Sequence, residues 1–544
     1  MDRGSTSRAA AVLLIVAIVA HTIIFSWLLI DRHRALVTHD PRDEAVNNQI
    51  IWHTAHGNPV LSTIKGNMRF HGHFRPVFFV AALPWLVWPH ASSYYFATSL
   101  TIALGALWVF KIARRKFLSD WQALGWSTAF LLFLPLNEIN LGNYDPEVFA
   151  ILPLVIGFDL YLRKRLGLFM LAAAATLACK ENLGIVLVGY SLHAMLSRRG
   201  LKWVLLPGLV GAGWMAVCIK LIIPLYYPMH NFVYLRFLHE QPKLSALVLY
   251  VVTQPLDALA RVAWAEHLDL ARRVLRSAGY LPLFSPLTLV LALPTAALVF
   301  LQYLPVNARQ THLLTGAVPF VFLAALLGAR WISDRLGRLL AARNIDSRVA
   351  ARGLCLYVLL SSLLLNFGSG IFGLGQDYGG PGSPPGSVSS IYDGRNFLQT
   401  DFTRKAAAAL AQIDDHDSVM TNDRFLLALS ERAMVWEIGT AVRMPRPDVV
   451  LINLTGFECH NCTYNPLLPG HLEMLADWAE SGEYQSLCVD QEIVFMRKNR
   501  GAGRGDPRPA ALLRVIAEVR RQELHQSLAA QAQLGWRNIS QGRP

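Results

Sequence analysis

One segment of the sequence, between its first and second apolar runs, carries an unusual set of reactive side chains. Two adjacent carboxylates, Asp43 and Glu44, precede a Trp and then a group of basic residues: Lys65, Arg69, His71, His73 and Arg75. A carboxylate can take the proton from a hydroxyl group, and cationic side chains can stabilise a departing phosphate. The set fits a transfer reaction that involves a hydroxyl and a phosphate, but an ordinary solvated, charged loop has the same kind of composition.

Two smaller polar groups stand at the ends of later apolar runs. The first contains Asp145 and Glu147, and an Asp before Pro146 is also a normal way to begin a helix. The second contains Lys180 and Glu181, which could simply neutralise each other at a membrane surface. Ionisable groups at membrane depth mark function more often than those in loops, so we expect all four to contact substrate or to support residues that do.

The composition indicates what must hold these residues in place. Of the 544 residues, 53% are hydrophobic and only 16% are charged, which is too apolar for a water-soluble protein of this size. The net charge of +13 is spread over short Arg and Lys clusters between apolar runs. The sequence therefore predicts a polytopic membrane protein and argues against nucleic-acid binding.

The apolar runs predict about eleven membrane crossings. The first, Ala9 to Ile30, is long enough to cross a hydrocarbon core of about 30 Å, and it ends without a cleavage site, so we expect an uncleaved span. Nine more are clear, and several of them are short. They cover about 92–113, 122–137, 147–162, 166–179, 183–197, 203–225, 286–303, 312–329 and 353–372. A weaker segment at 243–263 completes the count.

The Arg and Lys clusters favour this count, because such residues are retained on the cytoplasmic side of a membrane. With eleven spans, all the clusters fall on one side: Lys111 to Lys116, Arg163 to Arg165, Arg198 to Lys202, Arg272 to Arg276 and Arg330 to Arg352. The N-terminus is then cytoplasmic. The loop after the first span, the turn near Lys180 and everything after Gly373 are extracytoplasmic.

The sequence divides into four regions. A transmembrane domain covers 1–372, and a linker rich in Gly, Pro and Ser covers 373–395. Residues 396–499 alternate helical patterns with strand-like runs at 418–421, 433–438 and 449–452. They predict a small, soluble α/β domain with a closing hairpin across 485–496. Residues 500–544 form a basic tail with an amphipathic stretch that could be a surface helix. The expected fold class is thus a mainly α helix bundle with a small C-terminal α/β domain.

Three short motifs need separate interpretation. Gly368 to Gly373 fits G-x-G-x-x-G, but it ends a span instead of linking a strand to a helix, so we treat it as a chance match. Cys459 and Cys462 could be a redox pair, half a zinc site or a disulfide; on the outer face a disulfide is favoured, between these two or from one of them to Cys488. The Arg504-Gly-Asp506 tripeptide copies an adhesion motif, but it lies in an Arg/Gly-rich tail, so we also treat it as a chance match.

Several of these motifs together resemble a bacterial family of predicted membrane proteins called domain of unknown function 2079. The resemblance covers residues 40–330 well and the C-terminal domain more loosely. Its motifs are Gln49-x-x-Trp52, Ala55-His-Gly-Asn-Pro59, His73-Phe-Arg-Pro76, Asp145-Pro-Glu147, Lys180-Glu181, Leu293-Pro294 and the segment His312 to Pro319. That family is related to the GT-C superfamily of membrane glycosyltransferases, which use polyprenyl-phosphate sugars on the outer or lumenal face.

The resemblance implies a reaction and roles for residues. Asp43 matches the family's acidic position and would be the general base, with Glu44 orienting it or the acceptor. Where the family often has a second acid, this sequence has Asn48. The leaving phosphate would be stabilised by Lys65, Arg69, His73, Arg75, Lys180 and Arg309, while Asp145, Glu147 and His312 would contact sugar or acceptor. Glu181 is a further candidate for substrate binding. No cofactor is required, and a divalent metal is possible.

The implied partners are a polyprenyl-phosphate sugar donor, a glycan, lipid or protein acceptor, and membrane lipids, in a bacterial inner membrane that forms part of the cell envelope. The main alternative is a transporter or flippase for a lipid-linked precursor, which would also have many spans. Transporters usually place ionisable groups near the middle of the membrane and often have inverted repeats, and neither is clear in this sequence. A third possibility is a non-catalytic scaffold that displays the C-terminal domain.

Overall fold

The structure is a computed structural model in which the placement of part of the chain is described. The described residues are 3–36, 41–142, 145–226, 244–300, 313–368, 401–439, 445–454, 469–489 and 492–499, except positions 261, 263, 344 and 347, together with 514 and 517. They form two compact units. The helical unit contains 1–32, 50–61 and 68–396, and the α/β unit contains 33–49, 62–67 and 397–544.

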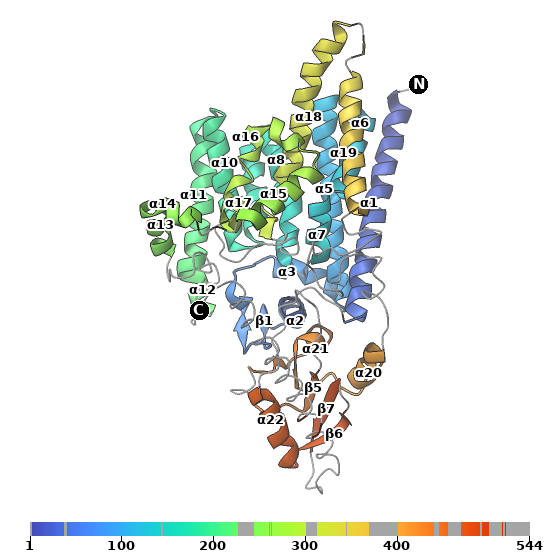
Figure 1. Ribbon diagram of the computed structural model, residues 1–544, viewed down its shortest axis with the longest axis vertical. Helices are drawn as coiled ribbons and strands as arrows, with labels where there is room; N and C mark the ends of the chain where they lie inside the picture. The colour runs from blue at the N-terminus through green and yellow to red at the C-terminus, as the bar shows by residue number, and fades with distance from the viewer. Residues whose placement is uncertain are drawn as a thin grey trace, which may run out of the picture. The chain divides into compact units, whose positions relative to one another are not determined.

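Four helices of the helical unit are long and apolar enough to cross a membrane, as far as the described residues show. They are α1 (Arg3–Arg34), α5 (Ser92–Phe117), the continuous run of α11 (Leu201–Val217), η4 (Cys218–Ile222) and α12 (Ile223–Tyr226), and α19 (Arg348–Gly368) (Figure 1). Apolar side chains such as Val12 and Leu209 are exposed on them, at 58% and 68%. Exposed apolar surface of this extent suits contact with lipid.

Further helices pack between and beside these spans. After α1 the chain forms α2 (Pro41–Ala55) and a two-stranded sheet of β1 (Leu61–Ser62) and β2 (Met68–Arg69). The remaining elements before α19 are, in chain order, η1 (Phe70–Gly72), α3 (Phe78–Ala81), α4 (Leu83–Val87), α6 (Asp120–Leu131), α7 (Leu134–Gly142), η2 (Pro146–Ala150), α8 (Ile151–Leu162), α9 (Leu166–Leu177), η3 (Glu181–Leu183), α10 (Gly184–Leu196), α13 (Leu244–Thr253), α14 (Pro255–Ala260), α15 (Trp264–Ser277), η6 (Leu281–Phe284), α16 (Pro286–Leu289), α17 (Leu293–Phe300) and α18 (Val318–Ala341). The chain is mostly helical, as the apolar runs predict.

The core of the helical unit combines aromatic side chains with very close helix contacts. Phe130, Phe133 and Trp126 surround Phe322 with ring centroids 5.3 to 6.0 Å apart. Where α10 meets α11, a Cβ added at Gly211 would lie 2.3 Å from the Gly184 carbonyl oxygen. Only glycine fits such an approach, which is typical of helices that associate within a membrane.

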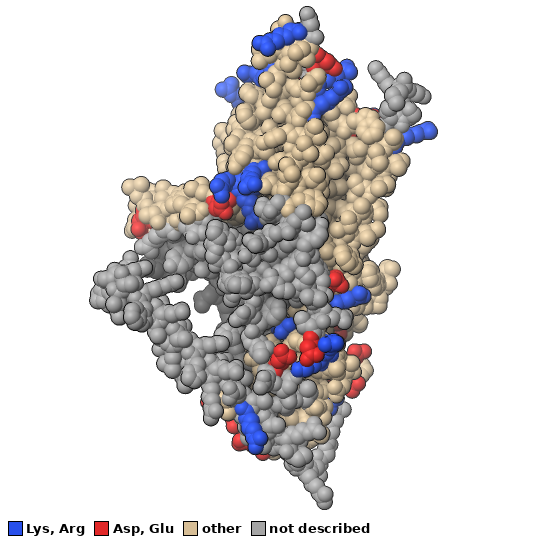
Figure 2. Space-filling model, turned by 45° about the vertical axis from the view of Figure 1, so that its right-hand side comes forward, with Lys and Arg blue, Asp and Glu red and all other residues tan. Residues whose placement is uncertain are grey.

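Three of the predicted basic clusters meet in the structure. Asp159 in α8 pairs with Arg115 at the end of α5 and with Arg163, whose Nη1 is 3.6 Å from it. Tyr161 lies two residues after Asp159, and the guanidinium carbon of Arg199 stands over its ring, 3.8 Å from the ring centroid. Figure 2 shows Lys and Arg gathered at the end of the helical unit where α18 leads toward α19, above a broad uncharged surface.

The predicted total of eleven spans stays a prediction. The weak segment 243–263 contains two short helices, α13 and α14, with a break before Pro255. Between residues 281 and 300 the helical structure is broken into η6, α16 and α17. Arg273 of α15 pairs with Glu138 of α7.

The α/β unit is built on a five-stranded sheet in the order β4-β3-β5-β7-β6. Its strands are β3 (Val419–Thr421), β4 (Val435–Glu437), β5 (Val449–Asn453), β6 (Tyr484–Val489) and β7 (Ile493–Lys498). β3 is parallel to β4 and β5, while β7 is antiparallel to both β5 and β6. The predicted strand-like runs and hairpin are therefore confirmed.

Helices cover this sheet and supply its core. They are α20 (Asp401–Leu410), α21 (Asp423–Leu429) and α22 (Pro469–Glu480). Leu472, Leu475 and Trp478 of α22 pack with Val450 and Met496 of the sheet. On α20, Phe402 stacks with Phe425 of α21 at 5.9 Å between ring centroids.

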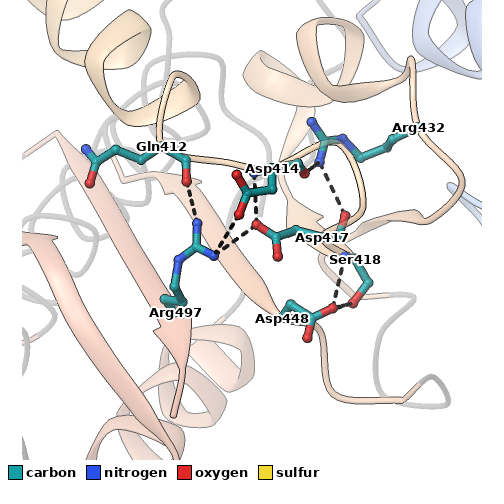
Figure 3. A network of polar contacts seen from close by, with 7 residues as sticks. All are labelled: Gln412, Asp414, Asp417, Ser418, Arg432, Asp448 and Arg497. Atoms are coloured by element: carbon teal, nitrogen blue, oxygen red, sulfur yellow. Dashed lines mark hydrogen bonds and ion pairs between the residues drawn. The ribbon is translucent and has the colours of Figure 1, made fainter. Parts of the chain in front are cut away.

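A polar network fixes the turn that leads into β3 (Figure 3). Arg432 donates from Nη1 to the carbonyl oxygens of Asp414 and Asp417, at 3.1 and 3.3 Å. Arg497 of β7 pairs with both side chains, at 3.1 Å to Asp417 and 3.8 Å to Asp414. These contacts hold Arg432 and the residues after it, which lead directly into the edge strand β4.

Candidate functional site

In the helical unit, the residues after β2 form a tight turn that presents His73. Phe70 and Gly72 both have positive φ, at +57° and +76°. The Phe70 amide donates to the Val60 carbonyl at 2.9 Å, which closes the turn. A left-handed Phe is costly and persists only where surrounding contacts require it. The turn is followed immediately by two predicted binding residues, His73 and Arg75.

His73 is bound to the buried carboxylate of Glu181. Its Nδ1 lies 2.8 Å from Glu181 Oε1, and the other carboxylate oxygen accepts the Phe74 amide at 3.1 Å. Burial lowers the pKa of His73 from its usual value, although the Glu181 charge opposes this shift. A neutral imidazole in this position donates its Nδ1 proton to Glu181, so the carboxylate fixes both the tautomer and the ring orientation.

The other predicted carboxylates of this unit pair with the remaining cations. Asp145 caps η2, since its Oδ1 accepts the Glu147 amide at 3.0 Å, and its Oδ2 lies 3.5 Å from Arg75 Nη2. Glu147 in turn lies 2.6 Å from Lys180 Nζ. The helix start expected at Pro146 is therefore confirmed. Lys180 and Glu181, adjacent in sequence, each pair with a distant residue instead of with each other.

These six side chains form one buried charge cluster, consisting of His73, Arg75, Asp145, Glu147, Lys180 and Glu181. Lys180 is 5% exposed and Glu181 is fully buried. In this cluster two cations, Arg75 and Lys180, pair with carboxylates, and the third carboxylate, Glu181, contacts His73. Arg75 and Lys180 are thus already neutralised by carboxylates, which limits what they can offer to a phosphate.

A small hollow lies beside this cluster in the same unit. It is shallow, too narrow in this structure to admit a water-sized sphere, and is lined by Arg69, Phe70, Gly72, His73, Phe74, Ile222, Ile223 and Tyr226. Phe70 lies 5.4 Å from the Tyr226 ring and 4.9 Å from the Phe74 ring, between centroids. The π-helical turn η4 ends at Ile222, and such turns are frequent at functional sites. A cation and an imidazole beside aromatic and aliphatic surface suit an anionic group on an apolar carrier.

The two candidate catalytic carboxylates belong to the α/β unit and differ sharply from each other. Both stand in the first turn of α2, where the helix dipole favours negative charge. The Asp43 side chain is 62% exposed and lies 3.9 Å from Lys65 Nζ. Glu44 is buried, with 7% of its surface exposed. Of the pair, Asp43 is the carboxylate that a dissolved or lipid-borne hydroxyl can reach.

Gln49 explains how this part of the first loop is held. It is fully buried, and its Oε1 accepts from Ser62 Oγ at 2.9 Å and from the Thr63 amide at 2.8 Å. Its Nε2 donates to Thr63 Oγ1 at 2.9 Å and to the Arg432 carbonyl at 3.2 Å. The sequence marked Gln49 as a motif residue and gave no role for it. The structure assigns it a structural role within the α/β unit.

The model of the family described as "Predicted membrane protein (DUF2079)" matches residues 43–479. The chain belongs to this family. The match to the DUF2079 model begins at Asp43 and covers both the buried charge cluster and the sheet of the α/β unit. None of the curated proteins matches the chain.

Two crystal structures of ArnT from Cupriavidus metallidurans resemble this DUF2079 protein at low sequence identity. The one bound to undecaprenyl phosphate has 11% identity and a TM-score of 0.49, and the match covers 90% of this chain and 99% of that chain. The apo structure has 12% identity and a TM-score of 0.47, over 90% of this chain and 98% of that chain. Because both scores are below 0.5, neither likeness supports a conclusion about fold or activity.

Several predicted residues lie outside the described part of the chain. They are Arg309 and His312, the linker 373–395, Cys459 and Cys462, the side chain of Cys488, and nearly all of the tail 500–544. Within the described residues, no group of three or more His, Cys, Asp or Glu is arranged to hold a metal ion. The predicted disulfide, the linker and the possible metal remain predictions.

Proposed function

We propose that this protein is a GT-C-type membrane glycosyltransferase that moves a sugar from a polyprenyl-phosphate donor to an acceptor hydroxyl. The observation that carries the proposal is the exposed Asp43 carboxylate at the start of α2, beside Lys65 and next to the buried Glu44. Membership of the DUF2079 family and the four apolar spans support a membrane enzyme. The resemblance of the sequence to GT-C enzymes supplies the reaction class.

Asp43 would act as the general base. It takes the proton of the acceptor hydroxyl as that oxygen bonds to the anomeric carbon of the sugar. The bond from this carbon to the phosphate oxygen breaks, and the polyprenyl phosphate leaves with one more negative charge. General-base help of this kind typically contributes about 10² to 10⁴ in rate.

The donor phosphate is assigned to Arg69 and His73, which line the hollow of the helical unit. Arg75 and Lys180 are buried in ion pairs, so we assign them to holding the cluster in place instead of to direct phosphate contact. Glu181 would orient His73 through the Nδ1 contact. Aromatic and aliphatic residues of the hollow suit the first isoprene units of the carrier.

The test uses the full-length protein in lipid nanodiscs with a panel of radiolabelled polyprenyl-phosphate sugars. Asp43→Asn should lower transfer by about 10² or more. Asp401→Asn is the matched control, because Asp401 is also an exposed carboxylate in the first turn of a helix and pairs with Arg404 at 3.2 Å. Equal transfer by wild type and Asp43→Asn would remove Asp43 from the mechanism.

The proposed orientation places the N-terminus in the bacterial cytoplasm and the α/β unit outside the inner membrane. Alkaline phosphatase fused after Pro544 should then be active, and a green fluorescent protein fused there should be dark. The reverse pattern would contradict the orientation.

A flippase or transporter for a lipid-linked precursor is the second candidate, and the buried charge cluster favours it, because transporters use such groups to couple movement to protons. In sealed vesicles, a flippase would move a fluorescent lipid-linked precursor between leaflets without breaking its sugar–phosphate bond. Sugar transfer without movement would exclude this candidate.

A further inference from the structure

One residue of the α/β unit, Glu437, contacts two separate parts of the first loop. It is the last residue of β4, and its amide donates to the Ile64 carbonyl at 2.9 Å. Its Oε1 lies 2.6 Å from Arg42 Nη2. The ion pair is largely shielded from water, with 7% of the Glu437 side chain and 16% of the Arg42 side chain exposed.

Each contact involves the residue immediately before Asp43 or Lys65. Arg42 immediately precedes Asp43, and Ile64 immediately precedes Lys65. Asp43 and Lys65 then meet at 3.9 Å. Glu437 thus fixes the chain position next to Asp43 with its side chain and the position next to Lys65 with its backbone.

The neighbouring contacts make this arrangement rigid without supplying charge. Thr63 Oγ1 donates to the Val435 carbonyl at 2.8 Å and accepts the Val435 amide at 3.0 Å. Asn48 Nδ2 donates to Ser430 Oγ at 2.8 Å. These neutral hydrogen bonds hold the loop on the unit even when an ion pair is removed, so the Glu437 carboxylate has a more specific effect.

That effect is to keep the Arg42 charge paired, instead of leaving it unneutralised one residue from Asp43. Lys65 lies 3.9 Å from the Asp43 carboxylate, and the charged residues next to Asp43 in the sequence are Arg42 and Glu44. With Glu437 in place, the Arg42 charge is paired with a carboxylate, and Lys65 lies near Asp43. Without the Glu437 charge, the Arg42 cation would favour the ionised form of Asp43 and so lower its basicity.

We propose that Glu437 is a positioning residue for catalysis, which sets the place and basicity of Asp43 through Arg42. This inference rests on the proposed function, in which Asp43 is the base. Because Glu437 belongs to the sheet, the α/β unit would take part in the reaction as the support of the catalytic carboxylate.

The first experiment measures transfer kinetics of Glu437→Gln in nanodiscs. We expect kcat to fall at least tenfold with KM for the donor unchanged within twofold, and the acidic limb of the kcat profile to move to lower pH. Glu483→Gln is the matched control, since Glu483 pairs with Arg446 in the same unit. Identical kinetics for Glu437→Gln and Glu483→Gln would overturn the proposal.

The charge swap Arg42→Glu with Glu437→Arg keeps the ion pair and should recover most of the lost kcat. If Glu437→Gln fails to fold, Arg42→Gln removes the cation together with the ion pair. The acidic limb of its kcat profile should then stay in place or move to higher pH, and a move to lower pH would overturn the proposal. Asp43→Asn is measured in parallel. Full activity of Asp43→Asn indicates that the proposed function has failed, whereas an inactive Asp43→Asn beside a fully active Glu437→Gln indicates that only the role of Glu437 has failed.

Discussion

Lys180 places its ammonium nitrogen 2.6 Å from a carboxylate oxygen of Glu147, and both side chains are almost completely buried. The two residues are 33 positions apart and lie at the starts of different helical segments, η3 and η2. This ion pair joins the two polar groups that the sequence shows at the ends of separate apolar runs.

We predict that removing one partner of this ion pair lowers the stability far more than removing both partners. Lys180→Met alone leaves a buried carboxylate without its cation and should lower the free energy of unfolding by about 3 to 5 kcal/mol. The double variant Lys180→Met with Glu147→Leu should recover most of that loss, because a well-packed apolar pair is often as stable as a buried ion pair. Denaturation in mixed micelles measures both, and additive losses would contradict the prediction.

His73 should make stability depend on pH below neutrality. Its pKa is lowered in the folded protein, mainly by burial, so the unfolded chain binds this proton at a higher pH than the folded protein does. Stability is therefore complete above the unfolded pKa of about 6.5 and decreases as the pH falls from there toward the folded pKa. His73→Gln removes this titration, so we expect a smaller loss of thermal stability between pH 7.5 and 5.5 than in wild type. Equal losses in the two proteins would contradict the assignment of a neutral His73.

The contact between α10 and α11 should tolerate no side chain. Gly211→Ala would place a methyl group 2.3 Å from the Gly184 carbonyl oxygen and 2.8 Å from the Leu187 Cβ. Overpacking of this kind typically costs about 1 to 3 kcal/mol. Gly213→Ala, two residues away on the same helix, is the control, since its Cβ would meet nothing within 4 Å. Thermal unfolding in detergent should separate the two variants, and equal melting temperatures would contradict the close approach.

Much of the fold follows from local sequence patterns. The strand-like runs near Val419, Val435 and Val449 and the final hairpin are confirmed, because alternating or continuous β-branched residues bounded by turns are a local signal. The helix start at Pro146 is likewise local, since Asp145 and the Pro that follows it specify it together. Helix α2 was not predicted, because its apolar positions do not form a clear stripe and the loop chemistry dominates its sequence.

The sequence indicates which residues belong to the candidate site, but it does not indicate which of them pair with each other. Lys180 and Glu181 look like an ion pair in the sequence, yet neighbours in a chain rarely face each other, and each pairs with a residue far away. The four hydrogen bonds of Gln49 and the Arg42–Glu437 pair join residues separated by 13 to 395 positions. No periodicity or spacing encodes such contacts, since they depend on how the chain packs.

The edge strand β4 is covered by residues 62–64, and its hydrogen-bond partner Thr63 precedes Val435 by 372 positions. At a synthesis rate of about 5 to 20 residues per second, Thr63 is made tens of seconds before β4 exists. Residues 62–64 therefore lack this partner until β4 has been translated, although their hydrogen bonds to Gln49 are local. An α/β unit expressed without residues 33–67 would keep an open sheet edge, which is a known route to aggregation. Assembly of the α/β unit thus depends on β4 pairing with a loop that was made far earlier in synthesis.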